Sequence, residues 1–539
     1  MNHPRADKTK IVFALVLAAY AVYAGAFIFR TSFVVDGVRH YCLFDDAMIS
    51  MRYARNLAEG HGPVWNAAED GVEGYTNPLW VAYMALLHLV PVHPSKVSLL
   101  VQITGAICLL GNLFFVRKIA QFLAGGSNWV WLAAVVLTAF YLPLNNWALQ
   151  GMEVGVATLL VSAAVWMAMK CLAHDRFSTW LYLLLALGVL VRMDLLVPGA
   201  IICGVLTLAD RKHRHRHWLA GLTALGTALA IQTVFRLVYY GDLLPNTYYL
   251  KMTGYPVLLR ICRGVLVLTD FIWNMNWMLF LLPLVLLVLR RDKYVALLLA
   301  VFGGQLAYSA YVGGDAWEWW GGANRYVAVA MPLFFVLLCS AVNTIAERLA
   351  QVGRSPQKQN TSSFFKRPYF VTCFVVLCLI SFNTLKGSGS LRQWALADTT
   401  MHVSDHQEMV RRSLVLREIS HPEAKVALIW AGIIPYFTDR QMIDLSGKND
   451  RHVARLEMHG PPPGTDRFRY FHPGHLKWDY GHSIGELRPD VVLQVAYPPG
   501  EAEAYLDGEY REVTLAGCRY YLREQSPQIR WDRVDELAE

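Results

Sequence analysis

Long apolar segments recur through the first 384 residues of this 539-residue chain. A helix needs about 20 apolar residues to cross a bilayer. Eleven segments reach or approach that length, at residues 11–30, 97–116, 128–145, 153–172, 178–192, 195–209, 218–240, 271–289, 294–312, 327–347 and 368–384. Hydrophobic residues make up 55% of the chain and charged residues 17%, a composition unlike that of a soluble globular protein. We therefore predict a polytopic α-helical membrane protein with about 11 spans.

The distribution of basic residues predicts the orientation of these spans. The net charge is +8, but the basic residues form short clusters between apolar segments, as topology signals do, and this argues against a nucleic-acid partner. With the N-terminus in the cytoplasm, every strong basic cluster falls inside, including RKHRHRH at 211–217. Residues 79–92 must then form a re-entrant or interfacial helix, because about 14 residues are too few to cross. The histidines of the basic tract resemble a metal-binding segment, but their alternation with arginine favours a charged cytoplasmic loop.

The same topology divides the chain into a membrane domain, residues 1–384, and a soluble tail, residues 385–539. It places on the outer side a long first loop at 31–96, later loops at 241–254 and 313–326, and the tail. Short strand-like runs at 424–430, 441–447, 489–497 and 518–524 are separated by Gly, Pro and Asp turns. We therefore predict a C-terminal α/β domain and a polar cavity where the outer loops meet.

Two adjacent carboxylates open the first outer loop, in the stretch FDDAMISMRYARNLAEGHG. The apolar spacing predicts a helix here, with Asp45, Arg52 and Asn56 on one stripe. In a structural interpretation, one aspartate caps the helix and the arginines anchor it to lipid head groups. Only one of Asp45 and Asp46 can be the cap, however. The other, in a partly desolvated pocket, can have a pKa raised enough to accept a proton from a hydroxyl.

The next segment, GPVWNAAEDGVEGYTNPLW, combines aromatic rings with amides and carboxylates, which suits a polyhydroxylated ligand. The alternative is an ordered interfacial loop with an aromatic belt. The candidate ligand contacts in this segment are Trp65, Asn66, Glu69, Glu73, Tyr75, Thr76 and Asn77.

Cationic side chains of the later outer loops are candidate phosphate ligands. Lys251 lies on the outer side beside Tyr248, against the positive-inside bias, so it either binds an anionic phosphate or snorkels to the membrane surface. Arg325 opens the following span and is a second candidate. The loop before it carries paired glycines and three tryptophans, Trp317, Trp319 and Trp320.

Two further sites are open to a functional or a structural interpretation. Arg192 and Asp194 interrupt an apolar run, and such pairs mark either a buried site or a purely structural ion pair. His475 in the tail either touches an acceptor or lies on the domain surface. The chain has no Walker A loop, GxSxG or HExxH motif.

The order of these motifs resembles a known family. The combination of FDDAMISMRYARNLAEGHGPVWN, VEGYTNPLW, LQGMEVG, VRMD, GDLLPNTYYLK, GGD, NRY, IPYF and MIDLSGKND runs through nearly the whole chain. It is similar to polyprenyl-phosphate-dependent glycosyltransferases of the GT-C superfamily, and within them to arabinofuranosyltransferase B of mycobacteria and bacterial pilin arabinosyltransferases. The chain departs from that pattern in GKND and GHLK, so its acceptor is expected to differ.

The resemblance implies a function and a role for each candidate residue. It implies an inverting transfer of a sugar from a polyprenyl monophosphate donor to a glycan or protein acceptor, on the periplasmic side of the bacterial inner (plasma) membrane. Asp45 would be the base, and Asp46 would orient the base or the acceptor hydroxyl. Phosphate binding would fall to Lys251, Arg325, Arg192 and Tyr248. Contacts to sugar or acceptor would fall to Arg52, Asn56, Glu73, Tyr75, Asn77 and His475.

Several properties stay open at the level of sequence. Arabinofuranose follows from the resemblance alone, and mannose, galactose or aminoarabinose are alternatives. A divalent cation, Mg²⁺ or Ca²⁺, suits paired carboxylates, although the ligand set is incomplete. A lipid-linked sugar flippase or transporter would also need many helices and buried charges, but the chain lacks the inverted repeats common in transporters. A third alternative is a receptor or assembly scaffold that binds its partner through the tail alone, in which case Asp45, Asp46, Lys251 and Arg325 would be structural charges.

Overall fold

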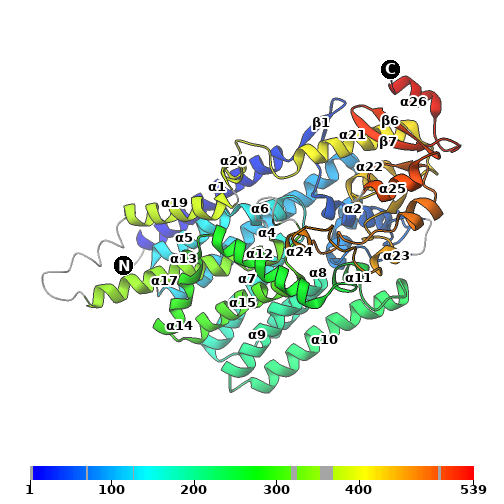
Figure 1. Cartoon of the computed structure of the whole chain (residues 1–539). Helices are drawn as coiled ribbons and strands as arrows, with labels where there is room; N and C mark the ends of the chain where they lie inside the picture. The colour runs from blue at the N-terminus through cyan, green and yellow to red at the C-terminus, as the bar shows by residue number, and fades with distance from the viewer. Residues whose placement is uncertain are drawn as a thin grey trace.

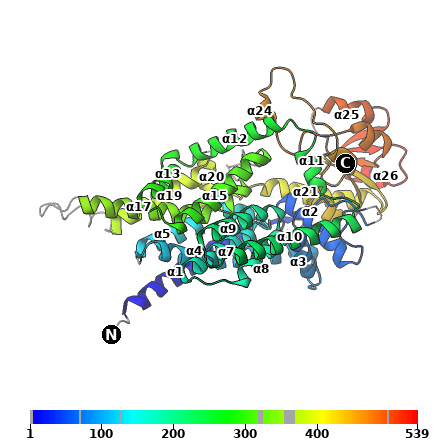
Figure 2. The same cartoon turned by 90° about the horizontal axis from the view of Figure 1, so that it is seen from below.

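The computed structural model describes residues 4–67, 71–125, 127–316, 318, 324–352, 368–385, 387–495 and 499–538. Figure 1 shows long helices packed side by side, with the strand-containing tail at one end of the molecule and the N-terminus at the other. The view turned by 90° gives the same arrangement (Figure 2). The tail lies next to α2 (Asp45–Ala58) and α11 (Asn246–Met252), because its short helices pack on both.

Six helices in the described part are long and apolar enough to cross a membrane. They lie within α1 (Pro4–Arg30), α4 (Pro94–Leu123), α7 (Val154–His174), α10 (Arg214–Tyr239), α15 (Lys293–Val312) and α17 (Met331–Val352). Local sequence fixes both ends of α15. The Asp292 carboxylate accepts hydrogen bonds from the amides of Tyr294 and Val295, and Gly313 ends the helix in the left-handed region at φ 89°.

Three further pairs of helices are bent, and counting each as one span raises the number of candidate spans to nine. They are α5 (Asn128–Ala139) with α6 (Leu142–Leu149), α12 (Val257–Asn274) with α13 (Trp277–Leu281), η2 (Leu282–Leu284) and α14 (Val285–Leu289), and α19 (Pro368–Thr384) with α20 (Ser388–Trp394). The expected straight span at 271–289 is therefore wrong. The chain breaks at Asn276, whose φ is 65°, and turns by 106°.

Two other expected spans form shorter helices. Residues 178–192 give α8 (Thr179–Val191), and residues 195–209 give α9 (Leu196–Ala209) after the turn η1 (Met193–Leu195). Arg192 is extended, at φ −159° and ψ 124°, because its side chain is held by acidic neighbours described below. The short segment at 79–92 gives α3 (Pro78–His88), whose 11 residues agree with the prediction that it does not cross.

The first outer loop forms a hairpin and a helix. Strand β1 (Phe33–Val35) pairs antiparallel with β2 (Val38–His40), and α2 (Asp45–Ala58) follows and packs on α3. The later outer loops form the short helices α11 (Asn246–Met252) and α16 (Arg325–Ala328). These elements lie at the tail end of the molecule.

The tail is the predicted α/β domain. Its five-stranded sheet has the order β4-β3-β5-β7-β6, with β3 (Lys425–Leu428) parallel to β4 (Gln441–Asp444) and to β5 (Val491–Val492). Strand β7 (Cys518–Arg523) runs antiparallel to β5 and to β6 (Tyr510–Leu515). The helical elements are α21 (Val403–Ile419), α22 (Ile433–Thr438), α23 (Arg451–Ala454), α24 (Arg467–Tyr470), η3 (Gly481–Glu486), α25 (Pro499–Leu506) and α26 (Trp531–Ala538).

The first outer loop and the tail are joined by directional polar contacts. Asn66 donates from Nδ2 to the Met442 carbonyl at 2.8 Å, and its Oδ1 accepts from the Met442 amide at 3.0 Å. Trp65 Nε1 donates to the Ala431 carbonyl at 3.0 Å. Asn66 thereby extends the edge of β4 as a strand residue would. The tail is therefore fixed against the first loop.

Candidate active site

A cavity of about 200 Å³ lies where the outer loops meet the tail. Its walls come from α2, the segment before α3, the turn around η1, α11, the end of α15, α16 and two tail loops. The polar side chains that line it include Asp46, Tyr75, Asn77, Glu153, Arg192, Asp194, Tyr248, Lys251, Asp315, Arg325, Tyr326 and Lys448.

Asp46 is the carboxylate at the centre of this lining. Its Oδ2 accepts from Nη1 of Arg325 at 2.9 Å, and its Oδ1 accepts from Nζ of Lys448 at 3.2 Å. Burial alone would raise the pKa of Asp46, but the charges of Lys448, Arg325 and Lys251 outweigh it and hold that pKa well below its usual range. Asp46 is therefore ionised and surrounded by cations.

The cations of the cavity differ in how far they are neutralised. Arg325 pairs with Asp46 and, through Nε, with Asp315 at 3.1 Å. Lys448 pairs with Asp46. Lys251 has no acidic partner within ion-pair distance among the residues described. Burial and the nearby Arg325 charge lower the pKa of Lys251 to about 8. Both effects disfavour the protonated amine, so an anion bound beside it would stabilise it.

Arg192 lies at the cavity wall and is held there by two carboxylates. Its Nε and Nη2 donate to the two oxygens of Asp194 at 2.7 Å, and its Nη1 donates to Glu153 at 3.0 Å. Glu153 also accepts from Asn77 Nδ2 at 2.8 Å. This bidentate arrangement holds one wall of the cavity rigid and leaves Arg192 less available to a ligand than Lys251.

Asp45 is not among the residues that line the cavity, and its side chain contacts the tail instead. Its Oδ1 accepts from the backbone amides of Gly432 at 3.2 Å and Ile433 at 2.9 Å, so it caps the first turn of α22 in the tail. Its side chain does not line the cavity. Burial raises the pKa of Asp45 to about 6, although Lys448 and the two amides act in the other direction. Neither aspartate caps α2, whose N-cap is Phe44 without a side-chain bond.

Of the six residues expected to contact sugar or acceptor, only Tyr75 and Asn77 line the cavity. Three of the other four are held by contacts elsewhere. Arg52 forms an ion pair with Asp439 of the tail. Asn56 donates to the Val64 carbonyl at 2.7 Å. Glu73 forms a buried ion pair with Arg236 of α10, and burial raises the pKa of Glu73 to about 7. These contacts shape the first loop and fix it to its neighbours.

The other candidates lie at or near the cavity. Tyr75, Asn77 and Tyr248 line it, and the Tyr75 hydroxyl hydrogen bonds to that of Tyr240 at 3.0 Å. His475 is only partly buried and does not line the cavity, and desolvation and the charges of Lys448 and Lys251 lower its pKa to about 3. Glu69 and the tryptophans at 317, 319 and 320 lie outside the described residues.

Sequence reasoning missed Lys448. It lies in the turn after β4, within the motif MIDLSGKND, and reaches the cavity from the tail. The local signal was a lysine in a loop at the carboxyl end of a buried strand, where ligand-binding residues often lie. The pairing of Lys448 with Asp46 joins residues 402 positions apart, which no local pattern predicts.

The fold matches that of ArnT from Cupriavidus metallidurans. The crystal structure bound to undecaprenyl phosphate superimposes with a TM-score of 0.52, covering 95% of this chain and 98% of that one at 10% identity. The apo structure also gives 0.52, over 99% of both chains. The chain therefore has an ArnT-like fold, with six to nine candidate membrane spans among the described residues and a C-terminal sheet domain, in agreement with the predicted fold class.

The chain is similar in sequence to two curated arabinofuranosyltransferases. The terminal β-(1→2)-arabinofuranosyltransferase of Mycobacterium tuberculosis is 27% identical over 217 residues, and that of Corynebacterium glutamicum is 28% identical over 258 residues. The alignments cover 38% and 43% of this chain and 34% of each relative, so the chain spans about a third of the length of the curated relatives it matches. Residues 395–529 match a domain of unknown function, DUF8728. The resemblance predicted from the motifs is thereby confirmed.

Proposed function

We propose that this protein is a glycosyltransferase that moves a sugar from a polyprenyl monophosphate donor to a hydroxyl of an acceptor. The observation that carries the proposal is the gathering of Lys251, Arg325 and Lys448 around Asp46 in one cavity. The names of the sequence relatives and the undecaprenyl phosphate bound to ArnT support the reaction class and the lipid.

The cations would stabilise the leaving group. As the bond between the anomeric carbon and the phosphate oxygen breaks, the electron pair stays on the phosphate and its charge grows. Lys251, which has no acidic partner within ion-pair distance in the described part of the chain, would bind that charge, with Arg325 and Lys448 beside it. A well-placed donor of this kind contributes about 3 kcal/mol to transition-state stabilisation. Cationic side chains then supply the charge that Mg²⁺ or Ca²⁺ would otherwise provide.

Asp46 is our assignment for the base, in place of Asp45. As the acceptor oxygen bonds to the anomeric carbon, its proton would pass to the Asp46 carboxylate, the one of the pair that faces the cavity. Donor phosphate would compete with Asp46 for Arg325 and Lys448. Weaker ion pairs would raise the pKa of Asp46 and make it a better base once the donor is bound. Asp45 would act by fixing α22 against α2 and so holding Asp46 in place.

The finer assignments rest on the relatives. Their name supports arabinofuranose as the sugar. The topology predicted from the basic clusters puts the cavity and tail on the periplasmic side of the inner membrane, where the acceptor would be a glycan or a protein. Tyr75, Asn77 and Tyr248 are our candidates for sugar or acceptor hydroxyls, because they line the cavity.

The test is transfer by purified protein from polyprenyl-phosphoryl arabinofuranose to an oligosaccharide acceptor, with mass spectrometry of the product. We expect transfer with inversion at the anomeric carbon. A protein that binds the donor lipid and moves it between leaflets without forming product would be a flippase, and would refute the proposal. The same assay with mannosyl and aminoarabinosyl donors identifies the sugar.

A further inference from the structure

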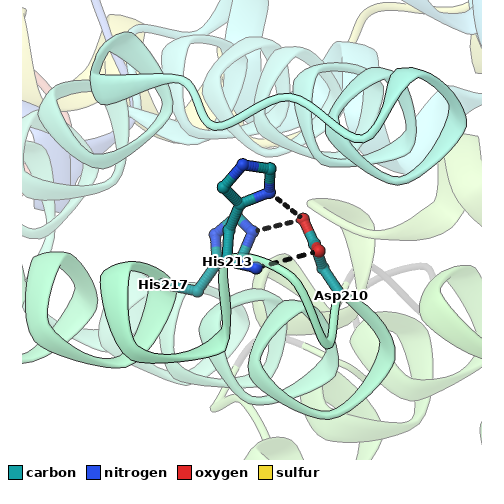
Figure 3. Close-up of side chains that lie close together, drawn as sticks. All are labelled: Asp210, His213 and His217. Atoms are coloured by element: carbon teal, nitrogen blue, oxygen red, sulfur yellow. Dashed lines mark hydrogen bonds and ion pairs between the residues drawn. The ribbon is translucent and has the colours of Figure 1, made fainter.

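The turn between α9 and α10 brings together a carboxylate and two imidazoles, far from the cavity. Asp210 ends α9, and His213 and His217 belong to the basic tract that opens α10 (Figure 3). The structure separates the histidines of this tract. His215 is exposed, whereas His217 is completely buried and His213 is largely buried. Within the alternating tract, His213 and His217 therefore form a His-x₃-His pair on the inner face of the helix.

The geometry of the three side chains suits a tetrahedral metal. Asp210 Oδ2 lies 3.0 Å from Nδ1 of His213 and 3.0 Å from Nε2 of His217, and one ligand atom of each residue lies within 4.8 Å of the others. A triangle with two sides of 3.0 Å and a third no longer than 4.8 Å has a point within about 2.5 Å of each corner. Zinc bonds to imidazole nitrogen and carboxylate oxygen measure about 2.0–2.2 Å, so small movements bring all three into range.

Neighbouring groups hold the ligands in this orientation. His217 Nδ1 lies 2.5 Å from the Tyr182 hydroxyl of α8. When the Nε2 lone pair points at a metal, Nδ1 carries the hydrogen and donates a hydrogen bond to the hydroxyl oxygen. The other carboxylate oxygen of Asp210 accepts from the His213 amide at 3.2 Å. An outer partner on the distal nitrogen of a ligating histidine is a recurrent feature of metal sites.

We propose that Asp210, His213 and His217 bind a divalent transition metal, with Zn²⁺ as the best fit, and that the ion is structural. Two imidazoles and one carboxylate match the ligands of this class, with water in the fourth position. The basic residues beside them, Arg211, Lys212, Arg214 and Arg216, are all exposed, so solvent weakens their repulsion of a cation.

The position of the site argues for a structural role. Helix α10 has 26 residues and is therefore about 39 Å long. The proposed site is at its beginning, whereas Tyr240 at its end meets the cavity residue Tyr75. The ion would join α9 to α10 and, through Tyr182, to α8. It would thus fix a helical hairpin of the membrane domain and take no part in sugar transfer.

The experiment is elemental analysis of the full chain purified in detergent without chelators. We expect about one zinc per chain in the wild type and in the matched control His215→Gln, and less than about a tenth of that in His213→Gln. After chelation, added Zn²⁺ should raise the melting temperature of the wild type and the control, but not that of His213→Gln.

Two results would overturn the proposal. One is a wild-type zinc content no higher than that of His213→Gln. The other is an equal thermal response of both proteins to Zn²⁺. If His213→Gln fails to fold, the chelated wild type and control are loaded with Co²⁺. Visible absorption bands of tetrahedral Co²⁺ are expected, and their absence in both proteins means that the cluster is only hydrogen-bonded. None of these readouts depends on glycosyl transfer.

Discussion

The pH dependence of Lys251 is the sharpest test of the candidate active site. Its pKa is lowered to about 8 from an ordinary value of 10.5, by burial first and by the charge of Arg325 second. The protonated amine is the form that attracts phosphate. It is present below pH 8 and is lost as the pH rises through 8. Because kcat/KM reports the free enzyme, it should fall above that pH.

The magnitudes follow from the same value. At pH 9, one unit above the pKa, about a tenth of the molecules keep a charged Lys251, so kcat/KM should drop about tenfold from its plateau. Lys251→Met removes the charge at every pH and should cost about 100- to 1,000-fold, or roughly 3 kcal/mol. Lys251→Arg keeps a charge beyond pH 12 and should abolish the decline, at the cost of some activity from altered geometry.

The assay is initial-rate transfer from a polyprenyl-phosphoryl sugar between pH 6 and pH 9.5 in buffers of one ionic strength. Burial also lowers the pKa of Lys477 to about 8, but its amine donates to the carbonyls of Ala454 and Tyr249 and does not line the cavity. A decline that persists in Lys251→Arg would belong to Lys477 or another group. Full activity in Lys251→Met would refute the role of Lys251 in binding phosphate.

Three other predictions concern the aspartates, the tail lysine and the first loop. Asp46→Asn should abolish transfer while donor binding persists, whereas Asp45→Asn should keep measurable transfer and lower the melting temperature; the reverse result would return the base to Asp45. Lys448→Met should cut kcat/KM about 100-fold with little change in stability, measured by transfer and thermal unfolding. Unchanged activity would mean that the tail adds no charge to catalysis. Glu73→Gln leaves Arg236 buried and unpaired and should destabilise the fold by about 3 kcal/mol, with near-normal activity per folded molecule. A selective loss of activity would restore Glu73 as a sugar contact.

The tail takes part in the cavity instead of being a separate attachment. Lys448 comes from the turn after β4, and Pro473 from the loop before β5 also lines the wall. On the other side, Asp439 of the tail pairs with Arg52 and Arg55 of α2. The helix that carries Asp46 is therefore held between the membrane domain and the tail. The tail thus supplies Lys448 and Pro473 to a cavity whose other lining residues come from the membrane domain.

The sequence predicts about 11 spans, whereas the described residues contain six to nine candidates. The apolar runs correctly located the long helices and the short α3, because bilayer thickness and helix rise translate directly into a run length. They could not show that Arg192 would leave the helix to meet Glu153, or that Asn276 would turn the chain. Both breaks depend on partners or packing distant in sequence.

The sequence by itself determined the membrane location, the basic clusters between spans, the α/β tail and the set of charged loops that meet, since each depends on composition or on periodicity within a few residues. Only the tertiary structure decided which aspartate faces the cavity, that Lys448 reaches Asp46, and that His217 is buried while His215 is exposed. Adjacent aspartates on a helix point about 100° apart, and which of them meets the cavity depends on where the tail packs. That packing is fixed by contacts across nearly 400 residues, such as Asp45 with Ile433.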